Sequence, residues 1–308
     1  MNKTFKTIPE QIEILKNKGL VITDNPATEE ILIRENYFFI VGYRHLFMNK
    51  DKKTYIEGTT FEELHALFSF DRQFRNVLFK NFLIVENNIK SIISYQLSKK
   101  YGYKENEYLK PASFSNDPEK YNQINDVINK MKRQIRNNCL KHSATAHYVN
   151  KYGYIPLWIL VKVLSFGLIG DLYDILKEPD QQAIASYYDI DVKTLGKYLT
   201  ILSNYRNLCA HEDIVYDNRT LTYIPDNKYH SMLNIPKQEK EYIYGKNDIF
   251  SVIIMLKVLL TKEAFELLIN EVNSLIKQLD YKVNTITMEK ILTKMGFVSN
   301  WKDIKEMI

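Results

Sequence analysis

The stretch from Thr60 to Tyr101 constrains this chain most, because it contains neither glycine nor proline and is followed by Gly102. It opens with Thr60 and Glu63 at the spacing of a capping box, in which the two side chains satisfy free amides at the start of a helix. Gly102 is of the residue type that most readily ends a helix. The stretch therefore predicts either one extended helix or two helices joined end to end.

Helical periodicity also dominates the rest of the sequence. Residues 262–282 place apolar side chains at the i, i+3, i+4, i+7 spacing of an amphipathic helix. Further helices are predicted over 118–140, 156–177 and 193–209, and shorter ones over 9–18, 26–36, 248–260 and 287–308. Strand signal is confined to 219–224, which we expect to form one arm of a small hairpin in a loop-rich insertion over 213–247. The predicted fold is an all-α helical bundle with additional helices and this small loop or hairpin insertion.

Composition narrows the class of protein. Hydrophobic residues make up 45% of the chain and charged residues 26%, as in an ordinary folded protein, and the net charge of +5 permits a nucleic-acid partner without requiring one. Neither Cys139 nor Cys209 belongs to a metal-binding cluster, so we expect no metal and no cofactor. The N-terminus lacks the apolar run of a signal peptide, and the apolar stretch 157–170 is too short to span a bilayer. These features predict a cytoplasmic protein without membrane association.

The sequence contains no phosphate-binding loop, dinucleotide-binding loop, zinc-protease motif or serine-hydrolase motif, which disfavours those enzyme classes. The best candidate for chemistry is Arg206-Asn207 followed by His211. Histidine titrates near neutral pH and can take a proton from an RNA 2′-hydroxyl. Arginine can stabilise the negative charge that develops on the phosphate, and Asn207 can orient either partner. This chemistry requires no metal.

The spacing alone is a weak signal, because Arg136 and His142 form a similar pair. On a continuous helix, positions five apart differ by about 140° in direction and about 7.5 Å along the axis. Arg206 and His211 therefore converge only if the helix ends near Leu208, or if a two-fold partner supplies a second set. The second alternative predicts a homodimer whose interface completes the site.

Other charged residues each allow two interpretations. Glu86 and Lys90, one helical turn apart, are either a surface ion pair or support for the site. Arg72 and Arg75, close to Asp71, belong either to an internal salt-bridge network, which we favour, or to an RNA-binding surface. A basic helical segment is either a phosphate-binding face or simply a solvated face; its members are Lys132, Arg133 and Arg136.

Several short motifs, taken together over about residues 30–220, are more specific than any one of them. Their order and spacing resemble the Abi-like family of bacterial abortive-infection proteins, the AbiD/AbiF group. The motifs are Asn36-Tyr37, Val41-Gly42-Tyr43, Gly58-Thr59-Thr60-Phe61, Phe70-Asp71-Arg72-Gln73-Phe74-Arg75, Glu86, His147-Tyr148 before Tyr152, Ile155-Pro156-Leu157-Trp158, Leu164-Ser165-Phe166-Gly167, and Arg206-Asn207 with His211.

The resemblance implies membership of the HEPN superfamily, whose α-helical members are often metal-independent RNases that act as dimers. It selects Arg206 and His211 over the rival pair, and it implies that Glu86 and Lys90 match a supporting polar feature. We expect three regions: an N-terminal helical region (1–60), a HEPN-like core that carries the Arg/His motif (61–225) and C-terminal helices that pack on the core (226–308). The resemblance also implies that some members of the group associate with a structured or inhibitory RNA.

The function expected on these grounds is a toxin-like endoribonuclease of anti-phage defence. One alternative is a scaffold, or ribonucleoprotein component, that binds RNA without cutting it. Another is a protein-interaction component that uses the predicted helices 156–177 and 262–282 as its interface. Replacement of His211 by alanine discriminates them, because only the enzyme depends on that imidazole.

Overall fold

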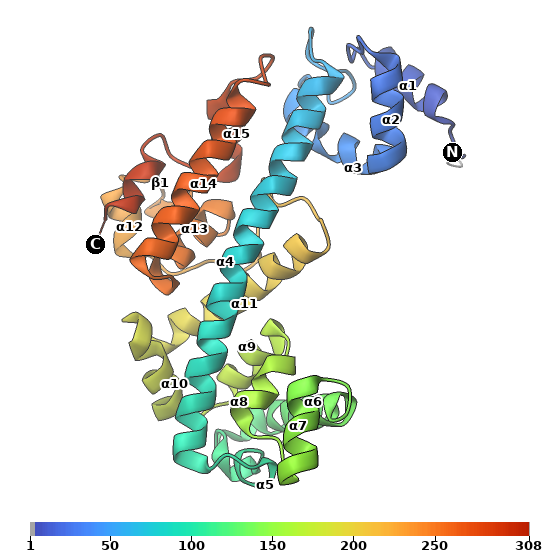
Figure 1. Cartoon of the computed structure of the whole chain (residues 1–308). Coiled ribbons are helices and arrows are strands. Elements are labelled where there is room, and N and C mark those ends of the chain that lie inside the picture. Colours follow the sequence, from blue (N-terminus) through green and yellow to red (C-terminus); the bar gives the residue numbers. More distant parts are fainter. Residues whose placement is uncertain (1–3, 308) are drawn as a thin grey trace.

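A computed structural model describes residues 4–307, and its central element is helix α4 (Phe61–Tyr101), which runs the length of the molecule (Figure 1). At its start the Glu63 amide donates to Thr60 Oγ1 (3.2 Å) and the Thr60 amide donates to Glu63 Oε2 (3.0 Å). The helix ends at Gly102, whose φ of +93° suits glycine. The predicted capping box is confirmed, and the stretch forms one 41-residue helix rather than two.

The other elements are grouped along α4 (Figure 1). Beside its N-terminal half lie α1 (Ile8–Asn17), α2 (Asn25–Glu35), α3 (Tyr37–Val41) and the 3₁₀ helix η1 (Gly42–Phe47). The middle of the chain contributes α5 (Glu105–Tyr108), η2 (Pro111–Ser113), η3 (Pro118–Lys120), α6 (Tyr121–Asn138), α7 (Ser143–Tyr152), α8 (Leu157–Leu160), η4 (Val161–Val163), α9 (Phe166–Asp174), α10 (Glu178–Ala185), η5 (Ser186–Tyr188) and α11 (Val192–Ala210). The C-terminal third contributes α12 (Lys228–Met232), β1 (Lys237–Gln238), β2 (Glu241–Tyr242), α13 (Ile249–Leu259), α14 (Lys262–Asp280), α15 (Met288–Met295) and η6 (Trp301–Lys305).

Helix α4 is packed on several sides, and 19 of its 41 residues are buried. Its principal neighbours are α14 and α11, with α8 and α10 against its C-terminal half and α3 and η1 near its start. The predicted apolar stripe of α14, which includes Phe265, Val272 and Leu279, is buried. The prediction of an all-α fold is confirmed. Within residues 4–307, no helix is both long enough and apolar enough to cross a membrane.

The predicted helix over 156–177 is interrupted, and this prediction was wrong in detail. The chain forms α8 and η4, becomes extended at Leu164 (ψ 137°), and begins again as α9. Ser165 caps the new helix by accepting a hydrogen bond from the Leu168 amide (3.3 Å). Serine stabilises a helix start better than a helix interior, so this local cap divides the apolar run.

The hairpin prediction was wrong in position. The only strands in the described part of the chain pair Lys237 with Tyr242 and Gln238 with Glu241. Residues 219–224 do not form a strand, because their hydrogen bonds go to an irregular segment instead. The Thr220 amide donates to the Asn247 carbonyl (2.9 Å), and the Ile224 amide to the Lys246 carbonyl (2.8 Å).

Candidate functional site

Helix α11 positions the candidate catalytic residues at its C-terminal end. The helix remains regular through Ala210, and His211 is its C-cap. The chain then reverses through Glu212, whose φ is +57°. The Asp213 amide donates to the Leu208 carbonyl (3.0 Å), as in the Schellman motif, in which glycine usually occupies the left-handed position. A glutamate in this conformation stores backbone strain beside His211.

This regular geometry excludes an early end of the helix as the way to bring Arg206 and His211 together. The guanidinium of Arg206 turns toward α4, where its centre lies 5.5 Å from the centre of the Phe79 ring. His211 is exposed at the helix end, and Asn207 is exposed one turn before it. Arg206 Nη1 lies 3.5 Å from Asn207 Oδ1. Arg206 therefore points toward α4, whereas Asn207 and His211 lie on the exposed side of the same helix end.

Glu86 and Lys90 form a buried pair behind Arg206, not a surface ion pair. Lys90 Nζ lies 2.6 Å from Glu86 Oε1, and the two side chains are 9% and 7% exposed. Glu86 Oε2 faces Arg206 Nε at 3.6 Å. Within residues 4–307 neither of these two atoms has a hydrogen-bond partner, although both are buried. Glu86 thus holds Lys90 on one side and attracts Arg206 on the other, which limits where the guanidinium can lie.

His211 lies between two hollows of the surface. One has a volume of about 830 Å³ and is bounded by His211, by the segment from Tyr37 to His45, and by Phe68 of α4. The other, of about 470 Å³, is bounded by His211, Asn207 and the segment 218–222. His211 is therefore exposed and contributes to the lining of both hollows. Among the described residues, no group of three or more His, Cys, Asp and Glu side chains is arranged to hold a metal ion.

The segment after His211 is fixed to α4 by Asp71. This fully buried carboxylate accepts hydrogen bonds from the amides of Val215 (3.1 Å) and Tyr216 (2.9 Å). It also accepts hydrogen bonds from the Tyr43 hydroxyl and Arg75 Nη1, both at 2.6 Å. Hydrogen bonds to an ionised acceptor are stronger than neutral ones. Asp71 therefore ties the N-terminal region, α4 and the return from the candidate site to one point.

Arg75 lies inside this network, so its expected place on an RNA-binding surface needs correction. Its side chain is 2% exposed, and Arg75 Nη1 also donates to the Asp213 carbonyl (3.3 Å). Arg72 is half-buried and makes two hydrogen bonds to the Glu35 carboxylate, at 2.8 and 2.5 Å. The hydrogen bonds from Arg72 lower the pKa of Glu35. Both arginines thus make contacts within the protein.

The basic segment of α6 lies apart from these contacts. Lys132, Arg133 and Arg136 are exposed and make no ion pair within residues 4–307. The opposite, apolar face of α6 is buried, and α6 packs against α9. None of the three basic residues lines either hollow beside His211. The structure leaves them accessible to a ligand without bringing them to the candidate site.

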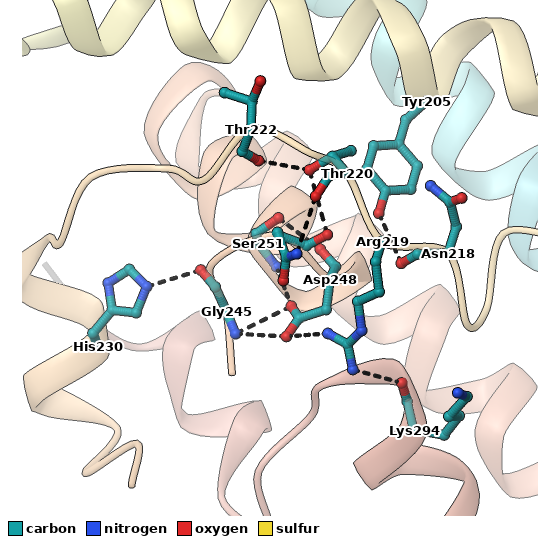
Figure 2. Close-up of polar contacts among 11 residues, drawn as sticks. Tyr205, Asn218, Arg219, Thr220, Thr222, His230, Gly245, Asp248, Ser251 and Lys294 are labelled. Carbon is teal, nitrogen blue, oxygen red and sulfur yellow. Dashed lines mark hydrogen bonds and ion pairs between the residues drawn. The ribbon is translucent and has the colours of Figure 1, made fainter. Parts of the chain in front are cut away.

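The C-terminal third positions the wall of the smaller hollow, a role for which we found no signal in the sequence. Figure 2 shows Arg219 held by the buried Asp248 (2.6 Å) and by the Lys294 carbonyl (3.1 Å). The hydroxyl of Tyr205, the neighbour of Arg206 in α11, donates to the Asn218 carbonyl (3.2 Å). The loop beside His211 is therefore fastened to α11 on one side and to the C-terminal helices on the other.

The fold and this site define an all-α protein in which one helix end carries an exposed histidine, His211, and an arginine, Arg206, that lies against Glu86 and Phe79 of α4. Residues 30–217 match the family model of Abi-like proteins. The chain belongs to the Abi-like family, and this membership supports its assignment as an abortive-infection protein. Searches of curated proteins and of solved structures found no match.

Proposed function

We propose that this protein is a HEPN-type endoribonuclease that cleaves RNA without a metal, with His211, Arg206 and Asn207 as its catalytic residues. The observation that carries the proposal is the combination of an accessible imidazole with an arginine held beside the buried Glu86–Lys90 pair at the end of the same helix. An arginine restrained by packing and charge is prepared to stabilise a phosphate without further reorganisation. Membership of the Abi-like family supports a role in halting growth during phage infection.

The proposed reaction needs only groups that the chain supplies. The RNA 2′-oxygen forms a bond to the adjacent phosphorus while its proton passes to a base, and the bond from phosphorus to the 5′-oxygen breaks. The leaving 5′-oxygen receives a proton, so the products are a 2′,3′-cyclic phosphate and a 5′-hydroxyl. His211 acts as the base or the acid, because imidazole does both near neutral pH. Arg206 stabilises the charge on the non-bridging oxygens.

The divergent directions of Arg206 and His211 support a homodimer as the active species. In this proposal, two copies meet at the ends of their α11 helices, and the arginine of one copy works with the histidine of the other. A mixture of Arg206→Ala and His211→Ala proteins tests the arrangement, because each mixed dimer would contain one site with both residues intact. Recovery of activity in the mixture supports sharing between copies, and its absence contradicts it.

The decisive experiment compares cleavage of mixed RNA by wild type and His211→Ala in EDTA, with analysis of product ends. Loss of the general acid or base should reduce the rate by roughly 10²–10⁴-fold, and wild-type products should carry 2′,3′-cyclic phosphate. His142→Ala is the matched control, because His142 belongs to the rival pair with Arg136, and it should cleave at the wild-type rate. RNA bound equally by wild type and His211→Ala without cleavage by either would favour the non-cleaving RNA scaffold.

A further inference from the structure

The larger hollow beside His211 is lined by aromatic side chains to which the proposed reaction assigns no role. Its volume of about 830 Å³ lies in the range of small-molecule and cofactor sites. The short helix α3 supplies Tyr37, Phe38 and Phe39 to its lining, and the return from α11 supplies His211. Two regions far apart in the sequence thus place aromatic rings and the candidate catalytic histidine around the same space.

The aromatic side chains are unusually open to solvent. Phe38 is 77% exposed and Phe39 is 57% exposed, although both are large and apolar. Their ring centres lie 6.4 Å apart in an edge-to-face arrangement. Asn36 has a φ of +64° and accepts a hydrogen bond from the Phe38 amide (2.9 Å), which fixes the start of α3. The chain therefore holds two phenylalanines toward water at the rim of the hollow, where a flat apolar ligand would cover them.

Cations without acidic partners line the same hollow. Lys18 and Arg44 make no ion pair within the described part of the chain, whereas Arg72 nearby is neutralised by Glu35. Arg44 Nη1 donates to the Val41 carbonyl (2.9 Å), which orients the guanidinium. The acidic members of the lining, Glu212 and Asp213, lie on the histidine side, and Glu212 is 3.6 Å from Arg72.

We propose that this hollow binds one or two nucleotides of single-stranded RNA next to the phosphate that is cleaved. A base stacks on the face of one of the two phenylalanine rings and meets the other ring at its edge, and the phosphates on either side of the base contact Arg44 and Lys18. Aromatic platforms flanked by cations bind unpaired bases in this way, whereas bases inside a duplex cannot reach such a platform. The inference rests on the proposed function, because it takes His211 to be the cleavage site.

Binding of fluorescein-labelled 12-nucleotide A and U oligonucleotides, measured by anisotropy in the His211→Ala background, tests the proposal without cleavage. Loss of stacking in the double variant Phe38→Ala/Phe39→Ala should weaken binding roughly 10-fold or more. Phe5→Ala is the matched control, because Phe5 is 88% exposed, does not line the hollow, and should leave the affinity unchanged. All three phenylalanines are exposed, so these variants should keep the unfolding midpoint. Arg44→Ala should weaken binding and reduce its salt dependence.

Three results would each overturn the proposal. They are equal affinities of the double variant and Phe5→Ala, tighter binding of the same oligonucleotides as duplexes, and no binding of the oligonucleotides at all. Cleavage kinetics in the wild-type background separate this failure from failure of the proposed function. His211-dependent cleavage with the same KM in the double variant would refute the pocket and leave the nuclease. Binding that depends on Phe38 and Phe39, without cleavage that depends on His211, would refute the nuclease and leave the pocket.

Discussion

Replacing Asp71 by asparagine should destabilise the protein by about 3 kcal/mol, the lower end of the cost of breaking a buried ion pair. Three donors share Asp71 Oδ2, namely Arg75 Nη1, the Tyr43 hydroxyl and the Val215 amide, and the Tyr216 amide meets Oδ1. An asparagine oxygen can replace the shared acceptor, but its NH₂ group must then face the Tyr216 amide. The variant also leaves the buried Arg75 guanidinium without a counter-charge.

Urea unfolding followed by circular dichroism measures this loss, and a double-mutant cycle with Arg75→Met isolates its cause. The double variant Asp71→Asn/Arg75→Met removes the orphaned charge, so it should be no less stable than Asp71→Asn alone. The cleavage rate of Asp71→Asn should also fall while the protein is still folded, because Val215 and Tyr216 fix the return from His211. A loss below about 1 kcal/mol, or strictly additive single and double variants, would refute this account of the network.

Three further predictions concern other buried contacts. Burial raises the pKa of Glu63, but hydrogen bonds to its carboxylate, from Thr285 above all, outweigh this effect and lower the pKa below its ordinary 4.5. The free energy of unfolding of wild type should therefore exceed that of Glu63→Gln by its full amount at pH 7, and the difference should shrink below about pH 4.5, as measured by urea unfolding. Gly296→Ala would place the new Cβ 2.2 Å from Asp248 Cγ, so it should lower the unfolding midpoint more than Gly153→Ala. Gly153 also has a positive φ, but a Cβ added there meets no atom within 4 Å, and equal losses in the two variants would contradict the clash. Lys90→Met should lower the cleavage rate with little change in KM for RNA, because the buried Glu86 would then pull Arg206 inward, and an unchanged rate would contradict this positioning role.

The sequence predicted the elements that depend on local chemistry. Helix α4 follows from a capping box at its start, glycine at its end and no helix breaker between them. The apolar stripe of α14 follows from the 3.6-residue period. The break at Leu164 and Ser165 was missed because apolar periodicity obscured a local serine cap.

The candidate site was predictable only in part, because local patterns in the sequence do not show which distant residues meet. The sequence and its family motifs singled out Arg206, His211 and Glu86, but no local pattern shows that Glu86 is buried behind Arg206. The hollow beside His211 was missed, because its lining comes from two regions that lie far apart in the sequence.

By itself, the sequence determined the all-α class, the helical stretch that ends at Tyr101 and the family, because capping, periodicity and motif order are properties of neighbouring residues. Only the tertiary structure decided that Arg75 points inward, toward Asp71. Asp71 also accepts hydrogen bonds from the amides of Val215 and Tyr216, which lie 144 and 145 positions after it in the chain. It also decided that the C-terminal third fixes the wall beside the catalytic candidate, through Asp248 and Arg219. Such contacts depend on which surfaces meet when the helices pack, and burial then makes each unpaired charge too costly to leave without a partner.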